Sequence, residues 1–186
     1  MNLNLAEIDK TWTLFLDRDG VINHEEHPKY VSTWEEFKFY DGVKEAMNIL
    51  NNHFNNIVMV TNQKGVGKQL MSIDDLNFIH QNMLEEINTA GGRVDKIYFC
   101  SDLEDSSPNR KPNPGMAFQA KADFPVIDFT KSIIVGNKPS DMKFGRNAGM
   151  HTVFVATTNP EVEYPNPLID LRFNDLLSFA YALTKA

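Results

Sequence analysis

The sequence predicts an α/β fold with a Rossmann-like, mainly parallel sheet flanked by helices, and three observations support this. Short apolar runs alternate along the chain with segments of helical periodicity. The runs are nearly continuous in apolar residues, which is typical of strands that are covered on both faces. Polar and charged side chains directly follow several of the runs, as expected where parallel strands end at a ligand-binding edge.

The expected strands are short and rich in β-branched and aromatic residues. They are TWTLFLD (11–17), NIVMVTN (56–62), KIYFCS (96–101), SIIVGN (132–137) and HTVFVA (151–156). Their length favours strands over buried helices. Because helical segments separate the strands, parallel pairing through crossover helices is the expected topology.

The expected helices lie between and after these strands. They cover 42–52, 72–90, 114–122, 140–148 and 174–185. The segment 72–90 has the clearest boundaries, since it opens with S-I-D-D, a capping residue followed by acids, and stops at two glycines. No internal repeat or linker interrupts the alternation, and 186 residues suit one domain, so we expect a single domain over 1–186.

The composition narrows the function classes. With one cysteine in the sequence, an intramolecular disulfide is excluded, and a reducing, cytoplasmic location is expected. No secretory signal and no apolar run long enough to span a bilayer is visible. The net charge of −7, without any Lys/Arg run, argues against a nucleic-acid partner. We expect a monomer that binds neither membranes nor nucleic acid.

The polar residues that follow the strands form one constellation. In chain order they are Asp17, Arg18, Asp19 and Gly20, then Thr61, Asn62 and Gln63, then Arg110 and Lys111, and finally Gly136, Asn137 and Lys138 with Asp141 one helical turn further on. The carboxyl ends of parallel strands meet at one edge of a sheet, so these groups are expected to converge. Carboxylates, a hydroxyl and cations would then share a single crevice.

This set of side chains suits phosphoryl transfer. Two carboxylates two residues apart, Asp17 and Asp19, can face the same site only if the chain bends, and Gly20 permits that bend. One carboxylate can then attack phosphorus while the other transfers protons. Mg²⁺ would hold the acids and the phosphate together. The Thr61 hydroxyl and the Lys111 ammonium suit the oxygens of the transferring group.

These motifs, in this order, resemble those of the haloacid dehalogenase-like (HAD-like) hydrolases. DRDGV, TNQ, RKP and GNKPSD match the four motifs of that superfamily. FLDRDGVIN, VTNQKGVG and RKPNPGM are more narrowly similar to the D-glycero-D-manno-heptose 1,7-bisphosphate phosphatases and the related histidinol-phosphate phosphatases. The resemblance covers roughly residues 13 to 156. It implies a Rossmann-like parallel sheet, here without a large cap domain.

The resemblance also implies a role for each matched residue. Asp17 would be the nucleophile and Asp19 the general acid and base, while Thr61 and Lys111 would stabilise the phosphoryl group. Arg110 would recognise substrate, and further substrate contacts are expected from Asn62, Gln63, Lys64 and Lys138. The expected Mg²⁺ ligands are Asp17, the backbone carbonyl of Asp19 and Asn137, with Asp141 as an additional candidate.

Two departures from the family pattern stand out. Many heptose-bisphosphate phosphatases carry a zinc loop, but here only Cys100 remains of its cysteines and histidine. One thiolate cannot assemble a tetrahedral site, so we expect no zinc and a buried, inert cysteine. The fourth motif has Asn137 where the family has aspartate. The loss of a charge should weaken Mg²⁺ binding unless Asp141 compensates, and Asn137→Asp should tighten it.

The sequence therefore predicts a Mg²⁺-dependent phosphatase that forms an aspartyl-phosphate, with heptose 1,7-bisphosphate as the leading substrate. Histidinol phosphate or another sugar phosphate is the alternative. A protein of another class, which binds phosphorylated ligands without hydrolysing them, is the second alternative because of Asn137.

The remaining features are read as structural or supporting. The segment 24–40 is expected to form a partial lid, and its His24 and His27 are interpreted as solvated. The other histidines, His53, His80 and His151, are interpreted as structural. The segment 64–68 (KGVGK) lacks the spacing of a P-loop and is expected to turn tightly through its glycines.

Overall fold

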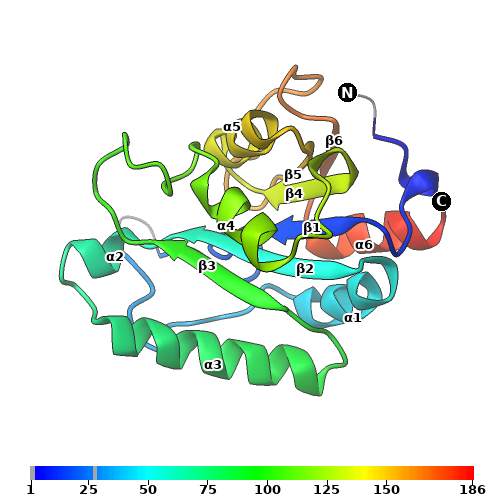
Figure 1. The fold of residues 1–186 in the computed structure, drawn as a ribbon. Helices are drawn as coiled ribbons and strands as arrows, with labels where there is room; N and C mark the ends of the chain where they lie inside the picture. Colours follow the sequence, from blue (N-terminus) through cyan, green and yellow to red (C-terminus); the bar gives the residue numbers. More distant parts are fainter. Residues whose placement is uncertain (1–2, 27–28) are drawn as a thin grey trace.

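The computed structural model describes residues 3–26 and 29–186, and its centre is a six-stranded sheet (Figure 1). Every strand pair is parallel, and the spatial order is β3-β2-β1-β4-β5-β6. The strands are β1 (Thr13–Leu16), β2 (Asn56–Asn62), β3 (Lys96–Cys100), β4 (Ser132–Gly136), β5 (His151–Val155) and β6 (Leu171–Phe173). The five expected strands are thus confirmed, with β1 shorter than predicted.

The sixth strand was missed by the sequence reading. β6 is three residues long, Leu-Arg-Phe, and pairs only with β5 at the sheet edge. A segment of that length carries too few residues to show a period of two. Its pairing with β5 therefore depends on the neighbouring strand rather than on a local signal.

The five expected helices are also present, with ends shifted by one or two residues. The helices are α1 (Val43–His53), α2 (Lys64–Gly67), α3 (Ile73–Thr89), α4 (Gly115–Asp123), α5 (Pro139–Ala148) and α6 (Leu176–Thr184). The predicted capping signal of α3 is real, since Ser72 and Asp75 exchange side-chain and backbone hydrogen bonds. The short helix α2 replaces the tight turn expected at 64–68. Its Gly67 lies so close to the Ser101 carbonyl that a Cβ would meet that oxygen at 2.0 Å.

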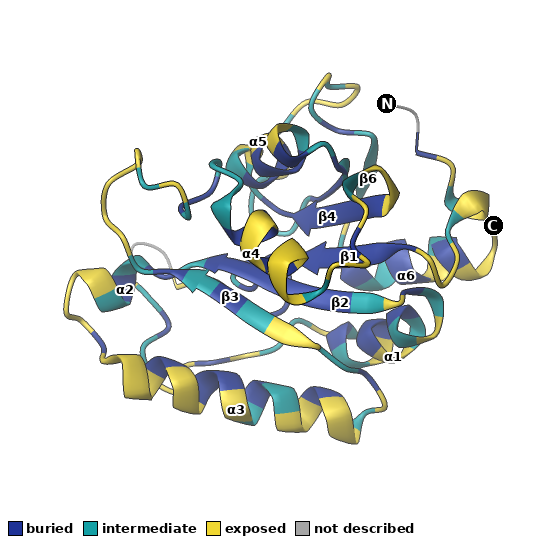
Figure 2. Ribbon diagram, viewed as in Figure 1, coloured by how far each residue is buried: buried dark blue, intermediate teal, exposed yellow. Residues whose placement is uncertain are grey.

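The helices cover the two faces of the sheet in two groups. Helices α1, α3 and α6 pack on one face, and α4 and α5 pack on the other. Along β1 the side chains alternate: Leu14 and Leu16 belong to the first core cluster, and Phe15 belongs to the second. Figure 2 shows the consequence, with buried central strands and exposed residues on the outer side of α3. The near-continuous apolarity of the strands follows from this double covering.

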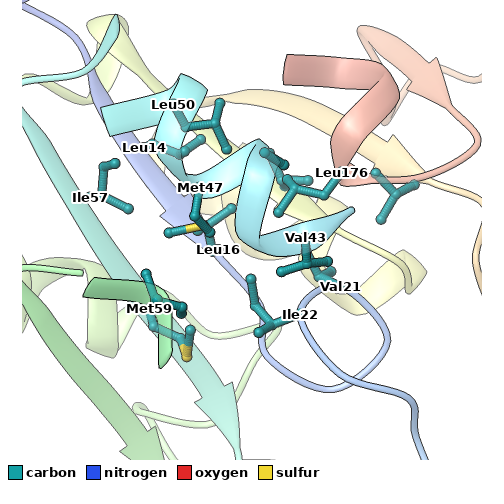
Figure 3. Packing of buried hydrophobic residues seen from close by; sticks show 14 of the residues in the cluster. Leu14, Leu16, Val21, Ile22, Val43, Met47, Leu50, Ile57, Met59 and Leu176 are labelled. Carbon is teal, nitrogen blue, oxygen red and sulfur yellow. The ribbon is translucent and has the colours of Figure 1, made fainter. Parts of the chain in front are cut away.

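The larger core cluster joins α1 to the sheet (Figure 3). Val43, Met47 and Leu50 recur at helical spacing and form one apolar face of α1. That face packs over Leu14 and Leu16 of β1, with Leu176 of α6 beside it. The packing fixes β1 at the centre of the molecule, and with it the position of the residues that follow the strand.

The order of the strands creates a switch point between β1 and β4. From β1 the chain proceeds to β2 and β3 on one side, and the later strands add on the other side, beginning with β4. A crevice forms at the carboxyl ends of the two strands where the direction of the order changes. The backbone N–H of Asp17 donates to the carbonyl of Val135 at 3.0 Å, which brings the ends of β1 and β4 into register there.

The segment between β1 and α1 folds back onto the end of β1. His24 N donates to Lys38 O at 2.9 Å and Tyr40 N donates to Ile22 O at 3.0 Å, which closes the segment on itself. Within its described residues it contains isolated bridges and turns, and no separate cap domain. In the described part of the chain, the helices are too short or too polar to cross a bilayer.

We predict that α1 packing controls stability. Leu50→Ala removes a side chain that is 0% exposed in the larger core cluster, so the free energy of unfolding should fall by about 2–5 kcal/mol. The matched control is Leu70→Ala, because Leu70 is 61% exposed. The control should change the free energy by less than about 0.5 kcal/mol. Urea unfolding of both variants tests this, and equal losses would contradict the packing.

Candidate active site

A polar cavity of about 610 Å³ opens at the carboxyl ends of the strands. It contains most of the residues that the sequence placed at this edge. Its lining includes Asp17, Arg18, Asp19, Glu25, Glu26, Lys29, Tyr30, Val31, Asn62, Gln63, Lys64, Asp105, Arg110, Lys111, Pro112, Lys138, Ser140 and Asp141. The convergence expected from parallel topology is therefore observed, and the segment after β1 supplies one wall.

Lys111 lies between two buried carboxylates in this cavity. Its Nζ is 2.8 Å from Asp17 Oδ1 and 2.8 Å from Asp141 Oδ1. The other oxygen of Asp141 accepts a hydrogen bond from the backbone N–H of Lys138 at 3.0 Å, which ties α5 to the group. Asp17 Oδ1 also accepts from the backbone N–H of Arg18 at 2.8 Å. All three side chains are less than 10% exposed.

The charges in this group are strongly perturbed. Burial raises the pKa of Asp17 to about 6, against the opposing attraction of Lys111, and Asp141 adds to the rise. Burial alone would lower the pKa of Lys111, but Asp141 and Asp17 outweigh it and raise that pKa. Lys111 therefore stays charged, and Asp17 is poised near neutral pH. Perturbed groups of this kind are typical of catalytic sites.

Asp19 is held by three neighbours on a turn that starts at the end of β1. Arg18 donates to both carboxylate oxygens, through Nη2 at 2.8 and 3.0 Å. Asn23 Nδ2 donates to Oδ1 and Gln63 Nε2 donates to Oδ2, each at 2.9 Å. Burial would raise the pKa of Asp19, but Arg18 and these hydrogen bonds lower it below its usual value. Gly20, with φ +89°, makes the turn possible.

Arg18 reaches Asp19 because a buried histidine supports it from behind. The Arg18 side chain is 1% exposed, and its Nη1 lies 3.1 Å from Nε2 of His80 on α3. Burial and the Arg18 charge lower the pKa of His80 to about 3, so the imidazole is neutral and accepts this hydrogen bond. His80 thus has a structural role, as expected, and this role is to hold Arg18 against Asp19.

The residues that end β2 organise the site. Gln63 Nε2 donates to Thr61 Oγ1 at 2.8 Å as well as to Asp19. Asn62 was expected to touch substrate, yet its amide is engaged with the backbone of Lys111, donating to the carbonyl and accepting from the N–H, both at 3.1 Å. Asn62 therefore positions Lys111 across the sheet edge. Gln63 thus links Thr61 to Asp19, and both amides that were predicted to bind substrate hold other residues of the site.

Two further cations at the cavity rim share one exposed carboxylate. Arg110 Nε donates to Asp105 Oδ1 at 3.0 Å, and Lys64 Nζ lies 3.7 Å from the same oxygen. Arg110 Nη1 also donates to the Asp102 carbonyl at 3.2 Å. Asp105 is 87% exposed. The pair of cations is therefore fixed at the rim by a carboxylate that solvent already screens.

Asn137, the unusual residue of the fourth motif, lies fully buried at the end of β4. Its Nδ2 donates to Glu25 Oε1 at 2.7 Å and to Thr158 Oγ1 at 2.5 Å. Its Oδ1 is a buried acceptor without a hydrogen-bond partner among the described residues. The other oxygen of Glu25 accepts from Lys138 Nζ. Glu25 therefore links Lys138 to Asn137.

The donors present fit a magnesium ion. Hard divalent cations take oxygen ligands, and an orphaned buried carbonyl oxygen such as Asn137 Oδ1 is a ligand in need of a partner. Asp17 and the backbone carbonyl of Asp19 lie on the adjoining turn. Among the described residues, no three His, Cys, Asp or Glu side chains form a metal cluster. A magnesium ion here would therefore be held by an amide and a backbone carbonyl as well as by a carboxylate.

Asp141 does not take the position expected for an additional metal ligand. One of its oxygens pairs with Lys111 and the other caps α5 through the Lys138 N–H. Gly136 permits this packing, because a Cβ there would lie 2.2 Å from Asp141 Cβ. This placement argues against Asp141 as a direct ligand: its charge orients Lys111 instead.

Sequence reasoning missed several residues of the site. Arg18, Asn23, Glu25, Asp105 and Thr158 were given no role, although each contacts a predicted site residue. Arg18 was named among the residues that follow the first strand, but the D-R-D motif did not indicate that its side chain is buried. His27 lies outside the described residues. His24, an exposed residue on the same segment, contacts the ring of Tyr40, with ring centroids 3.9 Å apart and the ring planes tilted by 39°.

The loop after β3 is held by local hydrogen bonds, as expected for a loop without zinc cysteines. Asn113 Nδ2 donates to the carbonyls of Asp105 and Ser107, at 3.0 and 2.8 Å. Ser107 Oγ donates to Asp102, and Cys100 is buried at the end of β3. Burial raises the pKa of the Cys100 thiol, which keeps it protonated. The absence of zinc stays a prediction.

Comparisons with known proteins agree with this geometry. Residues 108–171 match the HAD-hydrolase-like family model. The D-glycero-alpha-D-manno-heptose-1,7-bisphosphate 7-phosphatase of Mycobacterium tuberculosis is 32% identical, over 94% of this chain and 93% of that protein. The chain belongs to the heptose-bisphosphate phosphatase family of the HAD-like hydrolases.

Other members of the heptose-bisphosphate phosphatases are similar to this chain over most of their length. The D-glycero-beta-D-manno-heptose-1,7-bisphosphate 7-phosphatase of Rhodopseudomonas palustris is 37% identical, over 73% of this chain and 78% of the relative. A crystal structure of the D,D-heptose 1,7-bisphosphate phosphatase of B. bronchiseptica, complexed with magnesium and phosphate, superposes with a TM-score of 0.84 at 27% identity. That superposition covers 94% of this chain and 98% of that chain.

The raised pKa of Asp17 predicts a pH-dependent cost to stability. A carboxyl whose pKa is about 6 when folded and 3.8 when unfolded stabilises the folded state while protonated, and this contribution is lost as the pH rises through 6. Asp17→Asn should therefore gain stability over the wild type by about 1 kcal/mol between pH 5 and pH 7.5. Urea unfolding in EDTA measures this.

The control for this comparison is Asp74→Asn, an exposed aspartate on α3. Its difference from the wild type should be the same at both pH values. A pH-independent difference for Asp17→Asn would contradict the raised pKa.

Proposed function

We propose that the chain is a Mg²⁺-dependent phosphatase acting on D-glycero-D-manno-heptose 1,7-bisphosphate through an aspartyl-phosphate on Asp17. The observation that carries this proposal is the buried Asp17 carboxylate, held 2.8 Å from Lys111 beside Asp19 at the switch point of the sheet. The names of the relatives support the choice of substrate. The B. bronchiseptica relative, which binds magnesium and phosphate, supports the choice of metal and ligand class.

In the first step an oxygen of Asp17 attacks the phosphorus of the substrate. A P–O bond to the carboxylate forms while the P–O bond to the sugar oxygen breaks, and Asp19 donates the proton that the leaving oxygen takes up. The contacts with Arg18 and Gln63 favour ionised Asp19 in the free protein. An incoming phosphate dianion adds negative charge beside Asp19 and so favours the protonated form that this step requires.

In the second step water attacks the phosphorus of the aspartyl-phosphate. Asp19, now ionised, takes the proton from this water, the bond between phosphorus and Asp17 breaks, and inorganic phosphate leaves. The contacts that lower the pKa of Asp19 support its role as a base here. Lys111 and the Thr61 hydroxyl stabilise the oxygens of the transferring group in both steps.

Asp17, the backbone carbonyl of Asp19 and the amide oxygen of Asn137 would hold Mg²⁺. When bound, the ion neutralises part of the phosphate charge and aligns the phosphate with Asp17. The orphaned Asn137 oxygen supports its place in this set. Asp141 contributes by orienting Lys111 rather than by binding the ion.

The cations at the rim suit a substrate that carries two phosphates. Arg110 and Lys64 line the cavity and share Asp105, a carboxylate distinct from the Asp17–Lys111 pair. A second phosphate on the sugar would replace Asp105 as their partner, which favours a bisphosphate over a monophosphate. Histidinol phosphate, the alternative substrate, offers no second phosphate to these groups.

Several expectations from the sequence remain part of this proposal. We infer a single domain over residues 1–186 that uses no zinc and binds no nucleic acid. The monomeric state and cytoplasmic location also stay predictions. None of them changes the chemistry proposed for Asp17.

The proposed function is tested by a substrate comparison. With Mg²⁺ present, kcat/KM for heptose 1,7-bisphosphate should exceed kcat/KM for histidinol phosphate and for a generic phosphate ester by about 100-fold or more, because only the bisphosphate offers a second phosphate to Arg110 and Lys64. Preference for histidinol phosphate would replace the substrate. Absence of turnover on every ester would favour a protein that only binds phosphorylated ligands.

The role of Asp17 gives a separate prediction. Asp17→Asn should lower kcat by about 10³-fold or more, since an amide cannot form the acyl-phosphate. It should also abolish the stabilisation that beryllium fluoride, an acyl-phosphate mimic, gives the wild type in thermal unfolding with Mg²⁺. Glu26→Gln, which removes a carboxylate from the exposed cavity rim, is the matched control. Turnover retained in Asp17→Asn would rule out this nucleophile.

A further inference from the structure

We propose that Glu25 supplies the negative charge of the magnesium site that the neutral Asn137 lacks. The inference rests on the proposed function, because it assigns a further residue to the metal site of that reaction. The family pattern places an aspartate at position 137, whereas this chain places an amide there and a carboxylate beside it. Glu25 comes from the segment after β1 and Asn137 from the end of β4, so only the fold brings them together.

The contact between the two side chains fixes the direction of the amide. Asn137 Nδ2 uses its two hydrogens on Glu25 Oε1 and Thr158 Oγ1, at 2.7 and 2.5 Å. The amide oxygen consequently points the other way, where it is buried without a hydrogen-bond partner among the described residues. The Asn137 carbonyl oxygen, which has no hydrogen-bond partner among the described residues, and the Glu25 carboxylate are therefore held together as one Glu25–Asn137 unit. Together they offer the charge and the ligand atom that a single aspartate would provide.

This unit lies directly against the turn that carries the other expected ligands. A Cβ at Gly20 would lie 1.9 Å from Asn137 Nδ2 and 2.8 Å from Glu25 Oε1. Gly20 follows Asp19, whose backbone carbonyl is an expected ligand. The Glu25–Asn137 unit can approach the turn this closely only because residue 20 has no side chain, and Gly20 also has the positive φ of +89° that favours glycine.

The other acid near the fourth motif is committed elsewhere. Both oxygens of Asp141 are bound, one by Lys111 and one by the Lys138 N–H. Both oxygens of Glu25 are engaged as well, one by the Asn137 amide and one by the Lys138 ammonium, but the Lys138 side chain is 42% exposed while that of Glu25 is 14% exposed. Lys138 can swing into solvent when a divalent ion competes for Glu25. Glu25 is thus the acid that remains available to the ion.

The arrangement changes what an aspartate at position 137 would do. In Asn137→Asp, a carboxylate oxygen would replace the Nδ2 donor that now lies 2.7 Å from Glu25 Oε1. Two carboxylates in contact repel each other, so one of them would turn away from the site in the metal-free protein, and Mg²⁺ would have to bring it back. The single substitution should therefore fail to tighten Mg²⁺ binding, contrary to the expectation from the sequence alone. Asn137→Asp should strengthen Mg²⁺ binding only when residue 25 is uncharged, as in Glu25→Gln.

Isothermal titration of the metal-free, full-length protein with MgCl₂ tests the inference without substrate. Glu25→Gln preserves the size of the side chain and the acceptor for Asn137, and should weaken Kd for Mg²⁺ by about tenfold or more. The matched control is Glu26→Gln, which removes an exposed carboxylate from the adjacent position and should change Kd by less than about twofold. In Glu25→Gln/Asn137→Asp the charge is moved to position 137, and Kd should recover to within about threefold of the wild type.

Lys138 separates a direct effect of the Glu25 charge from an indirect one. If Glu25 only restrains Lys138, then Glu25→Gln/Lys138→Met should bind Mg²⁺ as tightly as Lys138→Met alone, and that result would overturn the proposal. If the Glu25 charge serves the ion, the double variant should bind about tenfold more weakly than Lys138→Met. Thermal unfolding of each metal-free variant verifies folding. Glu25→Ala, compared with Glu26→Ala, carries the same test if Glu25→Gln does not fold.

The remaining outcomes are distinct. Equal Kd values for Glu25→Gln and Glu26→Gln, with Mg²⁺ binding and turnover intact in the wild type, overturn the role of Glu25 and leave the proposed function standing. A wild type that neither binds Mg²⁺ nor hydrolyses any phosphate ester overturns both. Additive losses in Glu25→Gln and Asn137→Asp, without recovery in the double variant, also overturn the exchange of charge between the two positions.

Discussion

The site depends on one buried cation held between two carboxylates. Lys111 lies 2.8 Å from both Asp17 and Asp141, and without its charge two buried acids would face each other at the end of the sheet. Each oxygen of Asp141 is used to hold Lys111 or the start of α5, and Asn62 holds the Lys111 backbone from β2. These contacts link β2 with the segments that follow β1, β3 and β4 at the carboxyl edge of the sheet.

A second ion pair orients the other acid of the site. Arg18 is buried, bonds to both oxygens of Asp19 and is supported by the neutral His80 of α3. The two acids of the D-x-D motif thus have opposite environments: burial raises the pKa of Asp17, and Arg18 lowers that of Asp19. Two carboxyl groups with different pKa values suit different roles, one as a nucleophile and the other as a proton donor and acceptor. The separation arises from burial and from neighbours in the segments that follow β1, β2 and β3, rather than from the two aspartates themselves.

The fourth motif departs from the family pattern at position 137, where an amide replaces the aspartate. The Glu25 carboxylate accepts a hydrogen bond from this amide, and the amide oxygen has no hydrogen-bond partner among the described residues. Judged from the sequence, Asp141 was the natural compensating acid because it lies one helical turn away. The structure instead commits Asp141 to Lys111. A residue more than one hundred positions earlier in the chain takes the place next to Asn137.

The sequence by itself determined the α/β class, five of the strands, the capped helix α3 and the groups that meet at the sheet edge. Those features follow from local periodicity, from capping residues and from the rule that parallel strands end together. Only the tertiary structure decided the pairing of β6, the use of Asn62 as a backbone clamp, the support of Arg18 by His80 and the contact of Glu25 with Asn137. These depend on which side chains become buried next to one another, and burial is set by the packing of the whole sheet. The DRDG turn could therefore be predicted from the sequence, whereas the partners that shift the pKa values of its two aspartates could not.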